Sequence, residues 1–254
     1  MTVMEPKLAE RRKGVDEDRA RGRLKWVLLF LLLVGSVVAG IWLIRSPVLS
    51  IRQVTVTGAE RSDPGTAIAD LGMGNGTPTI DVDEAAILET LRSDPWVASA
   101  TVRVSFPGSI SVEVVEHVPF ASVMAADGWV TTSSDGAVVP ADAPVGAPTI
   151  SIDTGPVASG YDIANPLILG ALRFVAALPT ELAATTDVIS DGEGLVATVA
   201  GHRVLLGRPS DMTEKAIVLA SLIDSGIADV AEVNVIAPLR PAVTNPQVQV
   251  EPEE

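Results

Sequence analysis

Residues 94–121, DPWVASATVRVSFPGSISVEVVEHVPFA, give the clearest indication of the fold. Across residues 98–106 small or apolar residues alternate with Ser, Thr and Arg, which is the two-residue period of a strand with one buried face. Pro107-Gly108 is a turn pair, and the alternation resumes over residues 110–114. We therefore predict an antiparallel hairpin. The side chains expected to face its core are Ala98, Ala100, Val102, Val104, Phe106, Ile110, Val112 and Val114.

Upstream of the hairpin the sequence predicts one strand and two short helices. Residues 51–57 (IRQVTVT) are typical of a strand. Residues 62–64 (SDP) place a capping group before a proline, which predicts a helix that stops at Gly72. A second helix is expected to start near Asp81, with Glu84 completing a pair like a capping box. The expected order is β-α-α-β-β, with inward faces formed by Ala67, Ile68 and Leu71 in one helix and Ile87, Leu88 and Leu91 in the other.

Residues 26–44 predict a membrane-spanning helix. These 19 residues carry no charge and only one serine, and a helix of this length covers about 28 Å, close to the hydrocarbon core of a bilayer. Lys25 and Arg45 bracket the stretch, and Trp26 and Trp42 lie near its ends, where indole rings favour the membrane interface. A cleaved signal peptide has a shorter apolar run and a small-residue cleavage site. The pattern favours an uncleaved anchor.

Charge is distributed unevenly along the chain, whose net charge is −14. Residues 1–25 hold eight Lys or Arg against five Asp or Glu, whereas residues 26–254 hold ten against 27. The positive-inside rule then places the N-terminus in the cytoplasm and the acidic bulk outside. An acidic surface repels phosphate backbones, so we expect no binding to nucleic acid. The basic tail shows no apolar periodicity, and we expect it to be unstructured.

A second, β-rich region is expected after the hairpin, over residues 119–240. Asp135-Gly136 predicts a hairpin turn, and Asn165-Pro166 predicts the start of a helix. A later helix is expected from Ser210 or Asp211 to Asp224, with Ile217, Leu219, Leu222 and Ile223 facing inward. Short strands are predicted at residues 129–132, 137–139, 187–190, 195–199, 202–206 and 230–236, followed by an unstructured acidic end over residues 241–254.

The order β-α-α-β-β, with IRQVTVTG at residues 51–58 and the hairpin at residues 94–121, resembles a POTRA domain. With a membrane helix just upstream, the whole chain resembles the bacterial cell-division protein family FtsQ/DivIB. The family's second domain has a recurrent glycine-flanked strand and a lysine-bearing helix, which match Gly201–Gly207 and Lys215. One departure is Ile236-Ala237-Pro238, where the family often has a basic-aromatic-Pro cluster. No contact that relies on that aromatic ring carries over.

The resemblance implies an α+β fold in five parts. These are a cytoplasmic basic tail (1–25), a transmembrane helix (26–44), a POTRA domain (48–118), a β-rich domain (119–240) and a disordered acidic tail (241–254). The protein would be a single-pass type II protein of the cell membrane, with its C-terminal domain outside the cytoplasm and concentrated at the division septum.

The resemblance also implies a role as a divisome scaffold. The expected partners are other single-span division proteins, FtsB/DivIC-like and FtsL-like, together with septal wall synthases, and the POTRA domain would be the recruiting module. Two other classes remain open at this point: a membrane-anchored enzyme of the cell envelope, and an assembly chaperone of the POTRA type. The latter class usually carries several POTRA repeats and a barrel, whereas this sequence predicts one repeat.

Strand addition is the expected mode of partner binding. A last strand over residues 230–236 would offer unpaired amides and carbonyls to a partner segment, with alternate side chains setting specificity. The alternative is an ordinary core strand. The residues assigned to partner binding by this hypothesis are Val230, Glu232, Val233, Asn234, Val235 and Ile236.

The sequence predicts no catalytic, cofactor-binding or metal-binding residue. His117 and His202 are the only histidines, and no nucleophile motif accompanies them. The glycines between residues 72 and 76 lack the Gly-Lys-Ser/Thr ending of a phosphate loop. Asp81 and Asp83 supply too few oxygens for a calcium loop. The absence of cysteine excludes thiolate zinc sites, iron–sulfur clusters and a cysteine nucleophile. Acidic residues are numerous, but no pattern places two of them in one cleft.

Overall fold

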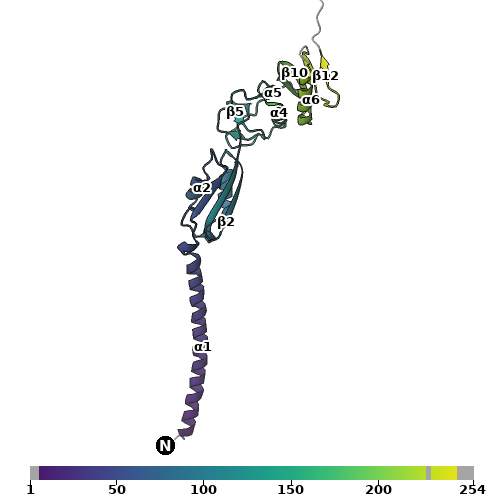
Figure 1. The fold of residues 1–254 in the computed structure, drawn as a ribbon. Helices are drawn as coiled ribbons and strands as arrows, with labels where there is room; N and C mark the ends of the chain where they lie inside the picture. The colour runs from purple at the N-terminus through teal and green to yellow at the C-terminus, as the bar shows by residue number, and fades with distance from the viewer. Residues whose placement is uncertain (1–5, 227–229, 245–254) are drawn as a thin grey trace, which may run out of the picture. The chain divides into compact units, whose positions relative to one another are not determined.

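The computed structural model describes residues 6–226 and 230–244 of the chain, with side chains from Leu24 onward. The fold is α+β, as predicted (Figure 1). The chain divides into two compact units, one with residues 1–55, 65–85 and 102–112 and the other with residues 56–64, 86–101 and 113–254.

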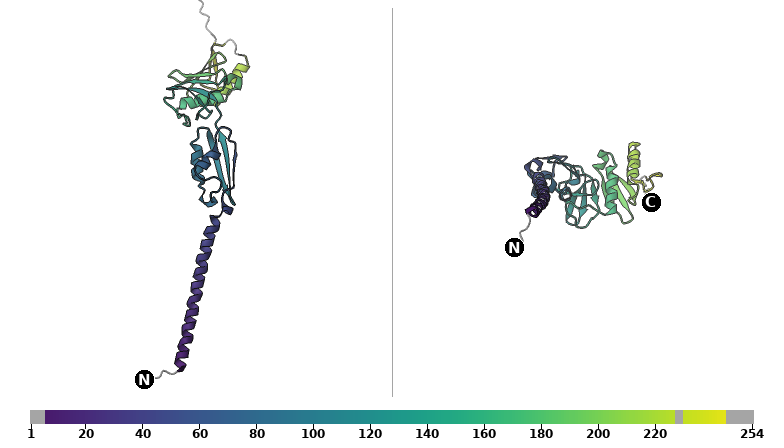
Figure 2. Two further views of the ribbon diagram at one scale, coloured as in Figure 1. Left: turned by 90° about the vertical axis from the view of Figure 1, so that its left-hand side faces the viewer. Right: turned by 90° about the horizontal axis from the view of Figure 1, so that it is seen from below.

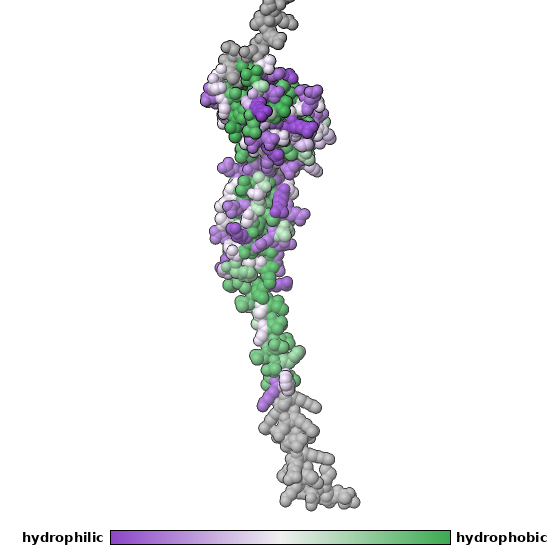
Figure 3. Space-filling view, turned by 90° about the vertical axis from the view of Figure 1, so that its right-hand side faces the viewer, coloured by the Kyte–Doolittle hydropathy of each residue, from purple (hydrophilic) through white to green (hydrophobic). Residues whose placement is uncertain are grey.

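The N-terminal helix α1 spans Pro6–Ile44. Its segment Leu24–Ile44 has 21 residues, a mean hydropathy of 2.8 and no buried residue in its most apolar stretch, so it is long and apolar enough to cross a bilayer. In Figure 3 the described surface of this helix is predominantly green, the colour of hydrophobic residues. The prediction of one apolar helix near the N-terminus is confirmed.

The helix begins earlier than the sequence predicts. We expect an unstructured tail up to residue 25, whereas the structure places residues 6–25 in α1. The tail is rich in Leu, Ala, Arg, Lys and Glu, which have high helix propensity. The apolar segment that follows supplies the costly first turns, so the helix extends toward Pro6, a residue suited to a first helical position.

A three-stranded sheet follows α1, with strand order β1-β3-β2. The predicted order β-α-α-β-β is present, and two 3-10 turns, η1 and η2, precede β1 and α3. The bounds are η1 Pro47–Leu49, β1 Gln53–Thr57, α2 Pro64–Asp70, η2 Thr79–Asp81, α3 Glu84–Arg92, β2 Val97–Ser105 and β3 Ser109–Glu116. The predicted core positions Ile68, Ile87, Leu91, Ile110, Val112 and Val114 are all buried.

Several local predictions about this region are wrong. Ala98 in β2 is exposed, and its neighbour Val97 is the buried residue at the start of that strand. Phe106 lies in the turn after β2 and is 67% exposed, because the turn carries its side chain away from the sheet. Leu71 follows α2 and is 37% exposed. Asp81 belongs to η2, and it is the Asp83 carboxylate that accepts a hydrogen bond from the Ala85 amide at the start of α3 (2.9 Å). The Glu84 carboxylate accepts from the Val104 amide instead of closing a capping box.

Glu116, at the end of β3, holds the loop that follows β1. Its carboxylate accepts hydrogen bonds from the amides of Glu60, Arg61 and Ser62 (2.8–2.9 Å) and from the Ser62 hydroxyl (2.7 Å). The Arg61 guanidinium lies 5.0 Å from the centre of the Trp96 ring, a cation–π contact. Desolvation raises the pKa of Glu116, but the hydrogen bonds from Ser62, Arg61 and Glu60 outweigh it and lower the pKa from 4.5 to about 2.

Within the described residues the second sheet has nine strands, in the order β12-β11-β10-β9-β8-β7-β4-β5-β6. Figure 2 shows it from two further sides. The strands are β4 Ala121–Ala125, β5 Gly128–Thr132, β6 Val138–Val139, β7 Thr149–Ser151, β8 Asp187–Ser190, β9 Leu195–Val199, β10 His202–Gly207, β11 Glu232–Asn234 and β12 Ala242–Thr244. The helices are α4 Pro166–Ala176, α5 Thr180–Ala183 and α6 Met212–Asp224.

One apolar row crosses this sheet in register. Paired positions on successive strands are all fully buried, and they form the core with α4 and α6. Positions one residue earlier or later on each strand point to the opposite face, where polar side chains prevail. The buried row is Val123, Ile150, Val188, Ala197, Val204 and Val233, and its polar neighbour is Ser122, Thr149, Asp187, Thr198, Arg203 and Glu232.

Most second-region predictions are confirmed. The strands at residues 187–190 and 195–199 have the predicted bounds, and Asn165 caps α4 by accepting a hydrogen bond from the Leu167 amide (3.0 Å). Ile217 is a correction, because it is 55% exposed and Lys215 takes an inward position on α6. The short helix α5 and the strand β12 are not predicted by the sequence pattern.

We predict that the Glu116→Gln variant is less stable than the parent chain at neutral pH and equally stable in acid. The folded pKa lies below the ordinary value, so the carboxylate stabilises the fold above about pH 4.5, and this contribution is lost as the pH falls toward 2. Chemical denaturation of the detergent-solubilised chain across this pH range measures the difference. The control is Glu113→Gln on the exposed face of β3. A constant difference between parent and Glu116→Gln at every pH would contradict the prediction.

Candidate partner-binding site

The strand predicted to bind partners is not at the edge of the sheet. β11 pairs in parallel with β10 on one side and antiparallel with β12 on the other. The prediction of an unpaired edge at residues 230–236 is therefore wrong within the described residues. The reason is that the chain returns after Pro241 to form β12, a strand of three residues in a segment whose composition is typical of an unstructured tail.

Two of the residues assigned to partner binding belong to the core. Val233 and Val235 have no exposed surface. Val233 lies between Val204 of β10 and Val243 of β12, and the Val235 amide donates to the Leu205 carbonyl (3.1 Å). An acidic substitution at either valine would test the core and not a partner surface.

The other assigned residues lie around the same strand and are partly exposed. The Val230 carbonyl is 2.6 Å from Nδ1 of His202, and the Glu232 carboxylate forms an ion pair with Arg203 (3.3 Å). The Asn234 side-chain oxygen accepts from the amide of Ile236, whose own side chain is 50% exposed. These contacts stabilise the end of β11.

The edge on this side of the sheet is β12. No other described strand pairs with it. Ala242, Val243 and Thr244 are all exposed, and Val243 is paired with the buried Val233. Because directly paired residues lie on the same face of a sheet, Val243 extends the buried apolar row to the edge. It is 47% exposed there.

A groove of about 570 Å³ lies between α6 and the loop that joins β11 to β12. Leu239 of the loop is 96% exposed, and Ile217 of α6 is 55% exposed. Two carboxylates, Asp211 and Glu214, border this apolar surface at the start of α6. We call it the α6 groove; its lining is Asp211, Glu214, Ile217, Val218, Ala237, Pro238 and Leu239.

The buried side chain of Lys215 holds α6 against the end of β10. Its side chain is 1% exposed, and Nζ donates to the carbonyls of Leu206 (2.7 Å) and Arg208 (2.9 Å). These carbonyls lie at the end of β10 and in the turn after it, so Lys215 joins α6 to that strand. Burial lowers the pKa of Lys215, and the nearby Asp211 carboxylate opposes this shift. The sequence pattern marks this lysine only through the family resemblance.

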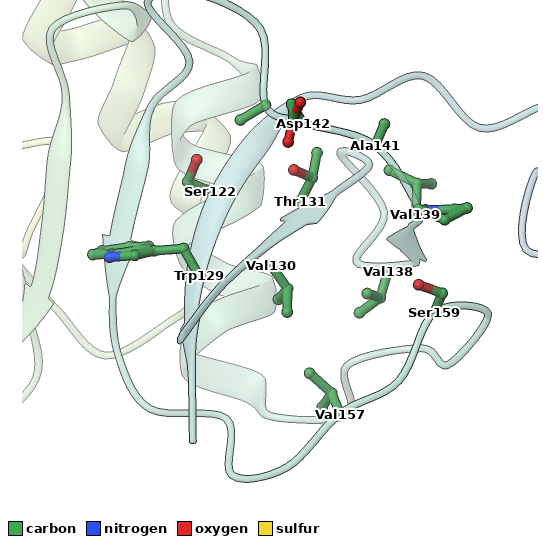
Figure 4. A pocket seen from close by; sticks show the side chains of 12 residues that line it. Ser122, Trp129, Val130, Thr131, Val138, Val139, Ala141, Asp142, Val157 and Ser159 are labelled. Carbon is green, nitrogen blue, oxygen red and sulfur yellow. The ribbon is translucent and has the colours of Figure 1, made fainter. Parts of the chain in front are cut away.

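A second pocket, of about 570 Å³, lies around β4, β5 and β6 at the far end of the sheet (Figure 4). Trp129 on its rim is 56% exposed. Asp142 is the one titratable side chain among the lining residues. Neither His117, which lies 3.5 Å from the Asp135 carboxylate, nor His202 lines it. In the part of the chain that the structure describes, no three His, Cys, Asp or Glu side chains are grouped to hold a metal.

The predicted membrane flanks lie at the ends of the apolar part of α1. Trp26 and Trp42 are each 73% exposed, and Lys25 and Arg45 are exposed as well. Both indoles are thus available to an interface at the two ends of the apolar segment, as anchors of a membrane helix require.

Comparisons with known proteins agree with the resemblance drawn from the sequence. Residues 49–117 match the family model of the POTRA domain, FtsQ-type. The cell division protein FtsQ of Mycobacteroides abscessus is 28% identical over 221 residues, which are 85% of this chain and 69% of that protein. FtsQ of Mycolicibacterium smegmatis is 29% identical over 83% of this chain and 63% of that protein. FtsQ of Corynebacterium glutamicum is 24% identical over 78% and 87%.

These similarities cover both the three-stranded sheet and most of the second sheet. The recognition of the FtsQ-type POTRA domain and of FtsQ-like organisation is therefore confirmed. The chain spans less than two thirds of the length of the Mycolicibacterium relative.

We predict that Lys215→Met lowers the free energy of unfolding by about 2 kcal/mol, because the carbonyls of Leu206 and Arg208 lose their donor. Urea unfolding followed by circular dichroism measures this change. Arg173→Met, at an exposed position on α4, is the matched control and is expected to change stability by less than about 0.5 kcal/mol. Equal effects of the two variants would show that the buried ammonium contributes nothing specific.

Proposed function

Because the chain carries an FtsQ-type POTRA domain and resembles FtsQ proteins along most of its length, we propose that it is a non-catalytic scaffold of the bacterial divisome. The scaffold binds other single-span division proteins, FtsB/DivIC-like and FtsL-like, at the septum and helps to coordinate septal wall synthesis. The proposed binding site consists of the edge strand β12 and the apolar α6 groove, which the loop between β11 and β12 helps to line.

Strand addition at β12 is the proposed mode of binding. A partner segment would continue the sheet by pairing with Ala242–Thr244, so its main-chain groups supply affinity. This moves the predicted contact from residues 230–236 to the next strand of the sheet. The residues around β11 then act by holding β12 in position.

The register of the sheet specifies the chemistry of the partner segment. A residue paired with Val243 would extend the apolar row of Val204 and Val233 and should itself be apolar. Its neighbours on either side would face the polar side of the sheet. The α6 groove accepts a further apolar side chain, and Asp211 and Glu214 favour a basic residue close to it.

The organisation of the chain follows from the same proposal. Residues 1–25 form the cytoplasmic tail, 26–44 the membrane span and 48–118 the POTRA domain. The β-rich partner-binding domain, expected over residues 119–240, extends to residue 244 because β12 belongs to its sheet. The excess of Lys and Arg before the span supports an N-terminus in the cytoplasm and an external C-terminal domain. The POTRA domain is the proposed recruiting module for the septum.

We predict that Val243→Asp weakens co-purification of the partner division proteins by about tenfold or more, which corresponds to about 1.4 kcal/mol. The new carboxylate would lie where an apolar partner side chain is expected, while 47% exposure makes it tolerable in the free chain. Pull-down of the membrane-anchored protein followed by quantitative mass spectrometry measures this loss.

The control for this pull-down is Val145→Asp, the same substitution at a fully exposed position before β7. Circular dichroism checks that both variants are folded. Unchanged partner recovery by a folded Val243→Asp variant would exclude β12 as the contact.

We predict that the two ends of the chain lie on opposite sides of the membrane. The chain has no cysteine, so Thr2→Cys and Val145→Cys each introduce a single thiol. In spheroplasts a membrane-impermeant maleimide should label Val145→Cys and should label Thr2→Cys only after lysis. The reverse pattern would overturn the proposed orientation.

A further inference from the structure

Three loops at one end of the three-stranded sheet each carry one exposed apolar side chain. Val48 in η1 is 59% exposed, Ile80 in η2 is 58% exposed, and Phe106 in the turn between β2 and β3 is 67% exposed. All three belong to the compact unit that also contains α1. None of them contributes to the core of the three-stranded sheet or to the site around β12.

Hydrogen bonds bring the three loops together. The Thr79 hydroxyl donates to the Leu49 carbonyl (2.5 Å), which places η2 against η1. The Arg52 amide donates to the Gly108 carbonyl (2.8 Å), which joins the β2–β3 turn to the same segment. A Cβ at Gly108 would lie 2.1 Å from the Ser50 carbonyl oxygen, so this close approach requires glycine. Ile80 and Phe106 line one shallow depression of about 490 Å³.

The chain itself keeps this cluster close to the end of α1. Only Arg45, Ser46 and Pro47 separate Ile44, the last helical residue, from Val48. Four residue steps reach at most about 14 Å even when fully extended. The Ser46 side chain accepts from the Val48 amide in η1, which shortens this distance further. The polar interface of a bilayer is about 5–8 Å thick on each side.

We propose that Val48, Ile80 and Phe106 form an apolar tip that inserts into the outer membrane–water interface beside the span. The proposal rests on the membrane anchorage proposed above. The occupant of the tip is the lipid surface, because a tether of this length holds Val48 within reach of it. The transfer of apolar side chains from water to the membrane interface lowers the free energy.

The charges around the tip favour apolar insertion over recognition of anionic headgroups. Arg45 and Arg52 are close to Val48, and the Arg52 guanidinium donates to the Val48 carbonyl (3.1 Å). Asp81, Asp83 and Glu84 border the depression beside Ile80. The two signs oppose each other, so the lipid contact should depend little on the charge of the headgroups.

Single-cysteine spin labels test the tip in the full chain, which has no cysteine of its own. The variants Ile80→Cys and Phe106→Cys are labelled with a nitroxide and placed in phosphatidylcholine nanodiscs without any partner protein. Relaxation enhancement by oxygen and by a water-soluble nickel complex is then measured. We expect an oxygen-to-nickel ratio several-fold above that of the control Val115→Cys, which is 57% exposed on β3. Val115 lies seven residues beyond Gly108, about 23 Å along the strand.

The span provides the internal reference. Leu33→Cys, within the apolar part of α1, should show the highest ratio. If the ratio is low, as in water, at residues 80 and 106 but high, as in lipid, at residue 33, the apolar tip is overturned and the membrane anchor stands. The exposed apolar cluster would then be a contact for a protein. An aqueous ratio at residue 33 would overturn both. The measurement is repeated in nanodiscs that also contain phosphatidylglycerol. Lipid contact that appears only in these nanodiscs would contradict the proposal, because the contact would then be electrostatic.

Discussion

The second sheet depends on register. Six strands place a fully buried residue of the apolar row side by side, and the polar row lies one residue away on each strand. A slip of one residue would bury Asp187 and expose Val188 in β8, or bury Arg203 and expose Val204 in β10. Either slip would move a charged side chain from the polar face into the apolar core, which is costly. Because one face of the sheet is apolar and the other is polar, pairings shifted by one residue are strongly disfavoured. Helices α4 and α6 then find an apolar surface of fixed outline to cover.

The two edge strands of this sheet differ in what covers them. At one end the loop before α4 covers β6, because the Val138 amide donates to the Tyr161 carbonyl and the Val138 carbonyl accepts from the Gly160 amide. At the other end β12 has a described partner on one side only. Unpaired edges invite association, and proteins usually cover them. An edge strand that no other described strand covers, at the place where the apolar row ends, is understandable if a partner completes the sheet.

Elements with strong local signals could be predicted from the sequence. The hairpin, the span and the strands at residues 187–190 and 195–199 follow from period-two alternation, unbroken hydropathy and glycine punctuation. The predictions that are wrong fail for local reasons. Phe106 continues the alternation but belongs to the turn, and Asp81 and Asp83 are equally good caps until backbone geometry selects one. Ile217 fits an inward apolar stripe of α6. Lys215 points inward instead, to donate to carbonyls at the end of β10, and Ile217 is exposed. β12 has only three residues, and only its pairing with β11 defines it.

In the proposed function, membrane attachment and partner binding are linked through the orientational freedom of the external domain. A domain that one helix and a short linker tether to a membrane can rotate and tilt, and the proposed partner in the same membrane would have to reach β12 despite that motion. Each restricted degree of freedom lowers the entropy that binding must remove. An apolar tip in the interface would remove tilt before the partner arrives, so that strand addition costs less. Apolar side chains suit this proposed role because they would hold the domain at the membrane surface and still let it diffuse laterally toward a partner.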